Sequence, residues 1–409
     1  MTTTQDVDHS EQVLLGVFGR PRTMLERGEG CTVYDTDGNA YLDLLGGIAV
    51  NALGHAHPAL VEAVTEAAGR LIHTSNFFVT PAQVELADRL LALAHAPAGS
   101  KVFFTNSGTE AIEAAVKLSR RTGRTRIVAM ENAFHGRTLG ALSLTHKAAY
   151  REPFEPLVPE VVWVPFNDVD ALRAAVDDNV AAVFIEPIQG EAGVVLAGTA
   201  FLQAARDVTR EHGALLVLDE IQTGVGRTGQ WFAHQRHGVQ PDVMTLAKGL
   251  AGGVPIGAVV TFGPGPSGLL APGQHGTTFG GNALACAAAL AVLRTIETDG
   301  LLVNAEKVGE HLQGAVAALG DPRIVETRGE GLLVAIQLTD EIAPALSAAL
   351  ERDGFIVNPV RPDALRLAPP LILTTEQVDD FVAALGRVLA DTPQPSTQPV
   401  QEQPAEERS

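Results

Sequence analysis

Short apolar runs alternate with stretches of helical periodicity over the first two thirds of the chain. Seven runs have the length and flanking residues of buried strands, namely 102–105, 126–131, 161–164, 181–186, 214–219, 243–247 and 256–262. Most are separated by enough residues for a helix. This alternation predicts an α/β fold in which helical crossovers join a mainly parallel seven-stranded sheet. Reactive side chains are then expected just after the apolar runs, where the carboxyl ends of the strands meet.

The pattern changes near residue 283, where the chain enters a second unit. A long helix rich in Ala and Leu is expected first, followed by further helical and strand patterns. The expected helices are 283–298, 304–319 and 341–353, and the expected strands are 332–338 and 365–368. These elements predict a smaller α/β C-terminal domain over about 291–390.

Both ends of the chain are polar. Residues 1–10 have few apolar side chains, and residues 391–409 are rich in Pro, Gln and Glu. Such segments bury too little apolar surface to offset the loss of chain entropy on folding. We therefore predict that both ends are disordered.

Composition narrows the class of protein and its partners. The 409 residues are 46% hydrophobic, which is enough for a large core. A formal net charge of −19 opposes binding to nucleic acids and anionic membranes, so neither is an expected partner. Cys31 and Cys286 have neither disulfide-framework nor zinc-site spacing, and we expect no metal. The sequence contains neither a secretory leader nor an apolar run of about 18 residues, so the expected location is the cytoplasm.

Two strand ends carry residues suited to one cofactor. The run ending at Leu218 is followed by Asp219 and Gln222, and the run 243–247 delivers Lys248 into glycine-rich chain. Taken alone, Asp219 could equally well be a helix cap, and Lys248 could be a solvated surface lysine. Together they indicate pyridoxal phosphate, which proteins hold through a lysine Schiff base and an acid at the pyridine nitrogen.

A phosphate-bearing cofactor also needs an anion site. The strand 102–105 leads through Ser107, Gly108 and Thr109 into a helix that starts near Glu110. Free backbone N–H groups and the helix dipole favour a phosphate there, and glycine permits close approach. An ordinary capped helix start has the same pattern, but its occurrence beside Asp219 and Lys248 favours the phosphate site.

From about residue 13 to 390 the sequence resembles the class III, ornithine-type aminotransferases. The resemblance rests on motifs that occur in the family's order: Asn106-Ser107-Gly108-Thr109-Glu110-Ala111, Phe134-His135-Gly136-Arg137-Thr138, Glu186-Pro187-Ile188-Gln189-Gly190-Glu191, Asp219-Glu220-Ile221-Gln222-Thr223-Gly224, Lys248-Gly249 and Gly276-Thr277-Thr278-Phe279-Gly280-Gly281-Asn282. It implies fold type I, with a large cofactor-binding domain over 58–290 and an N-terminal segment, 11–57, that packs with the small domain. It also implies a homodimer with two active sites at its interface.

The resemblance assigns roles to the matching positions. Lys248 carries the cofactor, Asp219 pairs with the ring nitrogen, and Gln222 bonds the phenolic oxygen. Phe134 is expected to stack on the ring, and the remaining cofactor ligands are expected at the phosphate: Ser107, Gly108, Thr109 and, from the other subunit, Thr278. Each role suits the chemistry, because a carboxylate stabilises the protonated pyridine and a freed lysine amine can transfer protons.

Within the family, the segment Gly46 to His55 and the Thr277-Thr278-Phe279 sequence most resemble the acetylornithine aminotransferases. That resemblance implies transfer of the terminal amino group of N2-acetyl-L-ornithine to 2-oxoglutarate, a step in arginine biosynthesis. Arg137 then binds the distant carboxylate of either substrate, and Arg366 binds the α-carboxylate of 2-oxoglutarate. Glu191 neutralises Arg366 when acetylornithine is bound. Thr277, where relatives often have Ser, touches the substrate region and leaves succinylornithine, ornithine, acetyl-lysine and 4-aminobutyrate as alternatives.

Other functions are less compatible with these residues. A binding protein on this fold would not need the lysine, ring acid and phosphate loop together, and an aminomutase, racemase or decarboxylase would not need the two arginines and Glu191. The Gly-x-G-x-x-Gly pattern at 224–229 is not expected to bind a dinucleotide, because it does not join a strand directly to a helix. His55 and His57 have no nearby acid or cysteine and are expected in a turn.

Overall fold

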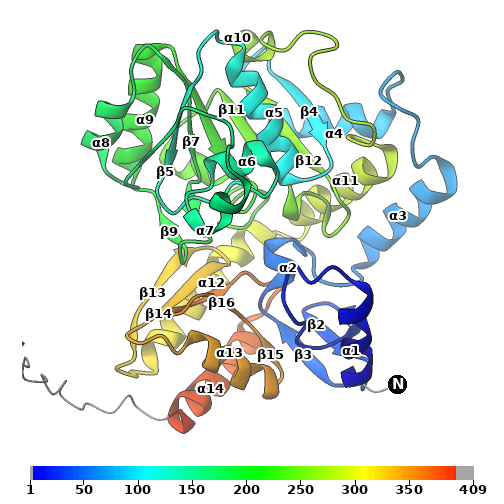
Figure 1. Ribbon diagram of the computed structural model, residues 1–409. Coiled ribbons are helices and arrows are strands. Elements are labelled where there is room, and N and C mark those ends of the chain that lie inside the picture. Colours follow the sequence, from blue (N-terminus) through cyan, green and yellow to red (C-terminus); the bar gives the residue numbers. More distant parts are fainter. Residues whose placement is uncertain (1–2, 393–409) are drawn as a thin grey trace, which may run out of the picture.

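The computed structural model describes residues 3–392 (Figure 1). Its largest sheet has seven strands in the order β4-β12-β11-β10-β7-β5-β6. Their bounds confirm the predicted runs: β4 (Lys101–Thr105), β5 (Arg126–Met130), β6 (Val161–Val164), β7 (Val180–Ile185), β10 (Leu215–Asp219), β11 (Val243–Leu246) and β12 (Gly257–Thr261). Neighbours from β11 to β6 pair in parallel, and β12 is antiparallel to both β11 and β4. The predicted mainly parallel α/β sheet is therefore confirmed.

Helices cover both faces of this sheet. Alternate side chains of β7 point to opposite faces, as the strand repeat requires. Val183 and Ile185 pack with α9 (Thr199–His212) and α8 (Val169–Ala175), whereas Ala182 and Phe184 pack with α5 (Gly108–Arg120). Because β7 is buried on both sides, its sequence is a continuous apolar run.

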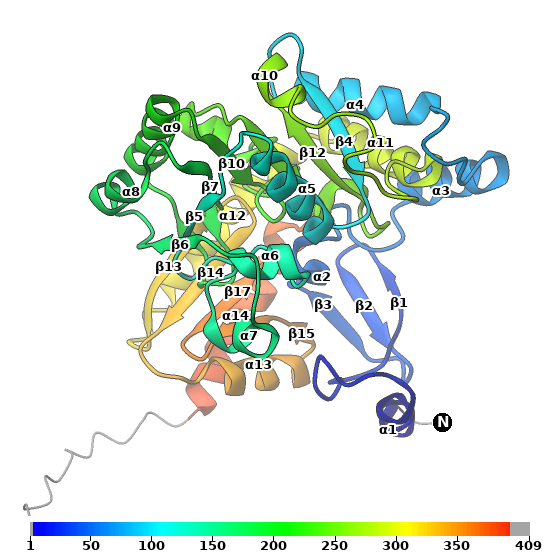
Figure 2. The same cartoon turned by 45° about the horizontal axis from the view of Figure 1, so that its top comes forward.

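The helices α3 (Pro58–Arg70), α4 (Pro81–Leu93) and α11 (Ala283–Thr298) lie together beside the β4 edge of the sheet (Figures 1 and 2). Shorter elements complete this part of the chain: α6 (Leu139–Leu144), α7 (Ala148–Arg151), β8 (Ile188–Gln189), β9 (Val195–Leu196) and α10 (Pro264–Ser267). The bounds of α11 match the prediction of a helix over 283–298. This helix connects the sheet to the C-terminal elements.

The C-terminal part contains a second sheet in the order β13-β14-β17-β16. The C-terminal part of the chain consists of α12 (Leu301–Ala318), β13 (Ile324–Glu330), β14 (Leu333–Leu338), α13 (Ala343–Arg352), β15 (Phe355–Ile356), β16 (Asn358–Arg361), β17 (Ala364–Leu367) and α14 (Thr375–Asp391). The predicted helices and strands occur here, whereas β13, β15, β16 and α14 were not predicted. The division into domains at about residues 58 and 291 stays a prediction.

The N-terminal residues add a third sheet. It consists of β1 (Leu25–Glu29), β2 (Thr32–Asp35), β3 (Ala40–Asp43) and the distant β15, which pairs in parallel with β3. This pairing joins the N-terminal segment to the C-terminal part. The short α2 (Gly46–Ala49) then brings the chain back to the large sheet (Figure 2).

The prediction of disorder at the N-terminus is wrong for most of that segment. Thr3–Val13 forms α1, where Val7 is buried and Arg20 pairs with Asp8 and Glu11. These contacts with the following chain supply stabilisation that composition alone does not show. The predicted disordered tail, 391–409, lies outside the described residues from 393 onward, and Asp391 ends α14. Within residues 3–392, no helix is long and apolar enough to cross a membrane.

Candidate active site

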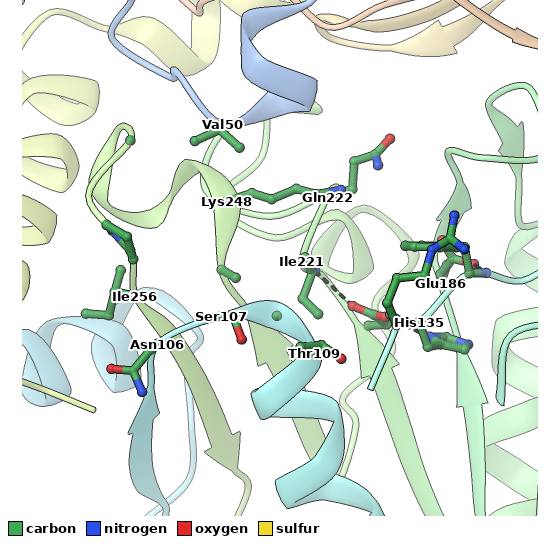
Figure 3. A pocket seen from close by; sticks show the side chains of 18 of the residues that line it. Val50, Asn106, Ser107, Thr109, His135, Glu186, Ile221, Gln222, Lys248 and Ile256 are labelled. Carbon is green, nitrogen blue, oxygen red and sulfur yellow. Dashed lines mark hydrogen bonds and ion pairs between the residues drawn. The ribbon is translucent and has the colours of Figure 1, made fainter. Parts of the chain in front are cut away.

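The carboxyl ends of β4, β10 and β11 border a cavity of about 410 Å³. Eight of the residues predicted to bind cofactor or substrate line it: Ser107, Gly108, Thr109, Phe134, Arg137, Asp219, Gln222 and Lys248. In Figure 3, Lys248 extends across the cavity toward Gln222, and Ser107 and Thr109 lie at the start of α5. The sheet thus brings together groups that are up to 141 residues apart in the sequence, from Ser107 to Lys248.

Asp219 is fixed at the end of β10 by three hydrogen bonds. Its Oδ1 accepts from Thr245 Oγ1 and from the backbone N–H of Ile221, both at 3.1 Å. Its Oδ2 lies 2.7 Å from Nδ1 of His135. Burial by itself lowers the pKa of His135, but the hydrogen bond and charge of Asp219, aided by Glu186, raise it above the usual value. The pair therefore holds a negative carboxylate next to a histidine that favours its protonated form.

Lys248 occupies a strained position two residues after the end of β11. Its φ of 42° lies in the left-handed region, which non-glycine residues seldom adopt. Removal from water and the nearby Arg366 lower the pKa of its amine to about 8, against the opposing charges of Glu191, Asp219 and Glu186. A lowered pKa makes the amine a better nucleophile near neutral pH.

The opposite end of the cavity is the N-terminus of α5. Ser107 caps this helix, since its Oγ accepts from Glu110 N at 3.3 Å. Thr109 Oγ1 lies 2.7 Å from Thr138 Oγ1. A Cβ on Gly108 would come within 2.9 Å of the side chain of Ile221, so only glycine fits between the helix start and this residue. The arrangement provides an anion site built from backbone N–H groups and hydroxyls.

Phe134 and Arg137 come from the loop after β5. The Arg137 guanidinium lies 3.6 Å from the ring centroid of Tyr150 and 5.6 Å from that of Phe134. Its side chain is exposed at the rim of the cavity. Tyr150, which the sequence analysis did not single out, holds this cation where it can meet a carboxylate.

Arg366 and Glu191 lie beside the cavity rather than in its lining. Arg366 is 2% exposed, and its Nη1 lies 2.5 Å from Glu191 Oε1 and 3.2 Å from Gln222 Oε1. Its Nη2 donates to Asn358 Oδ1 at 2.8 Å. The charge of Arg366 lowers the pKa of Glu191, although burial opposes this. The structure thus places the expected pair in direct contact and links it through Gln222 to Lys248's cavity.

Thr277 and Thr278 do not line the cavity in this chain. Thr277 Oγ1 accepts from Asn106 Nδ2 at 2.8 Å, and Asn106 is a lining residue. Thr278 is exposed to solvent next to Phe279, which is 59% exposed. The phosphate contact expected from Thr278 of another subunit stays a prediction.

Sequence reasoning missed two buried groups around Asp219. His135 and Glu186 both line the cavity, and burial raises the pKa of Glu186 to about 8. Both residues belong to the motifs that carry the family resemblance, but neither was given a role. The sequence did not reveal that both side chains are buried beside Asp219, because this depends on β5, β7 and β10 lying next to one another in the sheet.

The motifs that were set aside have other tasks here. Residues 224–229 form turns rather than the start of a helix, and His55 Nε2 lies 2.8 Å from Asp43 Oδ2. His57 directly precedes α3 as its N-cap residue. Among residues 3–392, no group of three or more His, Cys, Asp and Glu side chains is arranged to hold a metal ion.

The donors in the cavity fit a flat pyridine ring that carries an aldehyde and a phosphate. Asp219 lies where it would face the ring nitrogen, Lys248 lines the cavity where its amine would reach the aldehyde, and the N-terminus of α5 would face the phosphate. Fold and site together define a pyridoxal-phosphate-dependent enzyme.

Comparisons with known proteins identify the family. Residues 18–389 match the model of the class III aminotransferases, and the chain belongs to this family. It is 54% identical over 389 residues to the acetylornithine aminotransferase of Mycobacterium tuberculosis, covering 95% of this chain and 97% of that protein. The acetylornithine aminotransferase of Streptomyces coelicolor is 52% identical over 390 residues, with coverages of 95% and 96%.

Solved structures agree with this assignment. The ornithine aminotransferase of Toxoplasma gondii superposes with a TM-score of 0.90 at 31% identity, covering 95% of each chain. The acetylornithine aminotransferase of Elizabethkingia anophelis superposes with a TM-score of 0.85 at 35% identity, covering 95% of this chain and 99% of that one. The predicted fold, cofactor and aminotransferase class are confirmed.

Proposed function

We propose that this aminotransferase moves the terminal amino group of N2-acetyl-L-ornithine to 2-oxoglutarate, giving N-acetyl-L-glutamate 5-semialdehyde and L-glutamate in arginine biosynthesis. The observation that carries the proposal is the contact of Glu191 with Arg366 at 2.5 Å. A terminal amine has no adjacent carboxylate, so a donor of this kind leaves Arg366 without a partner, and Glu191 supplies the compensating charge. The names of the similar proteins support acetylornithine as the donor.

When bound, pyridoxal phosphate supplies an aldehyde that links to amines and a ring that accepts the electrons left when a proton leaves the substrate carbon. Asp219 would accept the hydrogen bond of a protonated ring nitrogen, while His135 keeps the carboxylate oriented. Gln222 would bond the ring's phenolic oxygen, and Phe134 would lie against the ring. Ser107, Gly108 and Thr109 would hold the phosphate, together with Thr278 of the second subunit.

Lys248 is the proton carrier of the reaction. With the cofactor bound, the amine of Lys248 would accept the proton that leaves the substrate carbon and, as its conjugate acid, would donate it again. A pKa of about 8 leaves a useful fraction of the amine neutral near pH 7 while its conjugate acid still donates. The fixed backbone at Lys248 keeps this motion within the cavity.

The two arginines separate the substrates by charge. Arg137 binds the carboxylate distant from the reacting amine, at the rim beside Tyr150, with Thr277 near the same region. Arg366 binds the α-carboxylate of 2-oxoglutarate or glutamate after Glu191 withdraws. Arginine suits both tasks because its planar fork grips a carboxylate through two hydrogen bonds.

We also propose that the enzyme is a cytoplasmic homodimer with shared active sites. An apolar surface next to the Thr277 segment supports a partner subunit: Asn76 Nδ2 donates to Thr277 O at 3.0 Å, and the adjoining Phe77 and Phe78 are 94% and 67% exposed. Such contiguous exposed aromatics are typical of interfaces. The buried free thiols of Cys31 and Cys286 fit a reducing compartment.

The donor is tested by single half-turnovers with purified holoenzyme. Acetylornithine, succinylornithine, ornithine, acetyl-lysine and 4-aminobutyrate are added separately, and the loss of the cofactor's visible absorption is followed. We expect the highest kcat/KM with acetylornithine. A higher value with any of the other amines would assign the enzyme to that donor instead.

A further inference from the structure

The C-terminal part of the chain packs against the loop at 224–229, which follows strand β10 of the large sheet. A Cβ on Gly226 would lie 3.1 Å from side-chain atoms of both Leu302 and Leu371, and one on Gly229 would lie 2.1 Å from Glu306 Cγ. Both glycines also have positive φ, at 85° and 84°. The glycine spacing that imitates a dinucleotide motif therefore permits close approach of α12 and the chain after β17.

Arg227, between these glycines, is a buried cation that binds only carbonyl oxygens. It is 2% exposed, and its Nη1 donates to Leu332 O at 3.0 Å and to Pro369 O. Its own carbonyl accepts from Leu332 N at 2.9 Å. In the part of the chain that the structure describes, no carboxylate forms an ion pair with it. Burial lowers its pKa to about 10, against the charge of Asp43, so it stays protonated at neutral pH.

A buried arginine without an acid partner is costly, because the desolvation of its charge is only partly repaid by carbonyl dipoles. An apolar side chain of similar size would join the two parts of the molecule without this cost. What the guanidinium adds is direction, since the N–H bonds of its planar Nη1 point in fixed directions toward the two carbonyl acceptors.

The two acceptors of Arg227 flank the strand pair that carries Arg366. Leu332 directly precedes β14, whose Ala335 is the register partner of Arg366 on β17. Pro369 lies three residues after Arg366 on the same chain. Arg227 thus holds both strands of this pair at the ends near the large sheet.

The segment 222–229, which includes this loop, also reaches Arg366 directly. Gln222 Oε1 accepts from Arg366 Nη1 at 3.2 Å. Gln222 and Arg227 are therefore two attachment points of one short loop to one strand pair. This loop continues the chain from Asp219, which is expected to bind the cofactor ring. The loop therefore fixes the position of Arg366 relative to the ring.

We propose that Arg227 is a positioning residue that sets Arg366 at the correct distance from the reacting carbon, and that it thereby determines the use of substrates with an α-carboxylate. The inference rests on the proposed role of Arg366. Glutamate and 2-oxoglutarate depend on the position of Arg366, whereas a terminal amine reacts while Arg366 is paired with Glu191. Displacement of Arg366 therefore impairs one half-reaction more than the other.

The test uses the holoenzyme variants Arg227→Lys and Arg227→Gln. Each is mixed with glutamate alone or acetylornithine alone, and kcat/KM for the half-turnover is expressed per bound cofactor, so that unfolded protein does not count. We expect a loss of about tenfold or more with glutamate, seen mainly in KM, because a misplacement of about 1 Å can cost that much or more. The loss with acetylornithine should be less than about threefold.

Two controls separate the possible causes. Arg323→Lys alters another buried arginine, which donates to Leu389 O and Thr392 O within the C-terminal part, and it should lower stability while leaving the ratio of the two half-reactions unchanged. Arg366→Lys should itself lose glutamate turnover selectively. If Arg366→Lys shows no selectivity, the proposed function fails; if it is selective and the Arg227 variants are not, only the role of Arg227 fails.

Equal losses in both half-reactions, or no loss, would overturn the positioning role. Failure of both Arg227 variants to bind the cofactor would assign Arg227 to folding and would overturn it as well. A selective loss that is larger in Arg227→Gln than in Arg227→Lys would support it, because lysine keeps the positive charge and N–H donors for the two carbonyls, whereas glutamine offers only a neutral amide.

Discussion

Replacing Glu191 with glutamine tests the charge switch that the proposed function requires. The substitution keeps the size of the side chain and a hydrogen-bond acceptor for Arg366, but it removes the negative charge 2.5 Å from the guanidinium. Arg366 then lacks a carboxylate partner unless a substrate provides one. Glutamate provides one at the reacting end, whereas acetylornithine carries its carboxylate at the far end and is drawn into a non-productive orientation.

The size of the effect follows from the exposure of the pair. Exposed ion pairs contribute about 0.2–1 kcal/mol, and breaking a buried pair costs about 3–5 kcal/mol. Arg366 is 2% exposed and Glu191 is 37% exposed, which places the pair between these limits. We therefore expect the loss of the Glu191 charge to change the relative free energies of the two half-reactions by about 1–3 kcal/mol. The ratio of kcat/KM for glutamate to that for acetylornithine should then rise roughly 5- to 150-fold.

The assay is the pair of half-turnovers, followed by absorption, in wild type and Glu191→Gln. A matched control is Asp321→Asn, which removes the charge from the 2.7 Å pair with Arg323 outside the cavity, where the arginine is 7% and the acid 19% exposed. The control should leave the ratio unchanged. A ratio that moves less than about twofold in Glu191→Gln would refute the switch.

Two further predictions concern the cofactor. Because the pKa of Lys248 lies at about 8 rather than 10.5, and only the neutral amine attaches to the cofactor, reconstitution of the apoenzyme should speed up with pH to about 8 and then level off. A stopped-flow series over pH measures the reconstitution rate. A rate that keeps rising up to the ordinary lysine pKa would contradict this prediction. The control Lys248→Ala should show no absorption change from covalent attachment of the cofactor. Asp219→Asn should lower kcat about 100-fold or more, equivalent to ~2.7 kcal/mol of barrier, because the neutral amide cannot stabilise a protonated ring nitrogen. Steady-state kinetics at saturating cofactor measures the effect, and a loss below about fivefold would argue against the ring-nitrogen role.

Local sequence patterns predicted most strands of the large sheet and the site residues that lie at strand ends or at the start of α5. Buried strands are continuous apolar runs, so their ends are visible in the sequence: Asp219 is the last residue of β10, and Lys248 lies two residues after the end of β11. The start of α5 is equally local, because Ser107 caps the helix three residues before its partner. The family motifs then gave these positions their roles.

The short outer strands escaped prediction because their stability comes from distant partners. β1 is largely exposed, and β15 has only two residues, which pair with β3 more than 300 positions earlier. No local periodicity marks such elements. The helix at Thr3–Val13 likewise depends on contacts with the chain that follows it.

Only the tertiary structure decided how charges meet around the cofactor. Asp219 and His135 are 84 residues apart, and Arg227 reaches carbonyls 105 and 142 residues away. Hydrogen bonds of this kind leave no spacing in the sequence, since backbone carbonyls exist at every position and burial depends on the packing of whole layers. The sequence by itself therefore determined which residues are expected to bind the cofactor, and the packing of the C-terminal part on the loop after β10 decided where Arg366 stands relative to them.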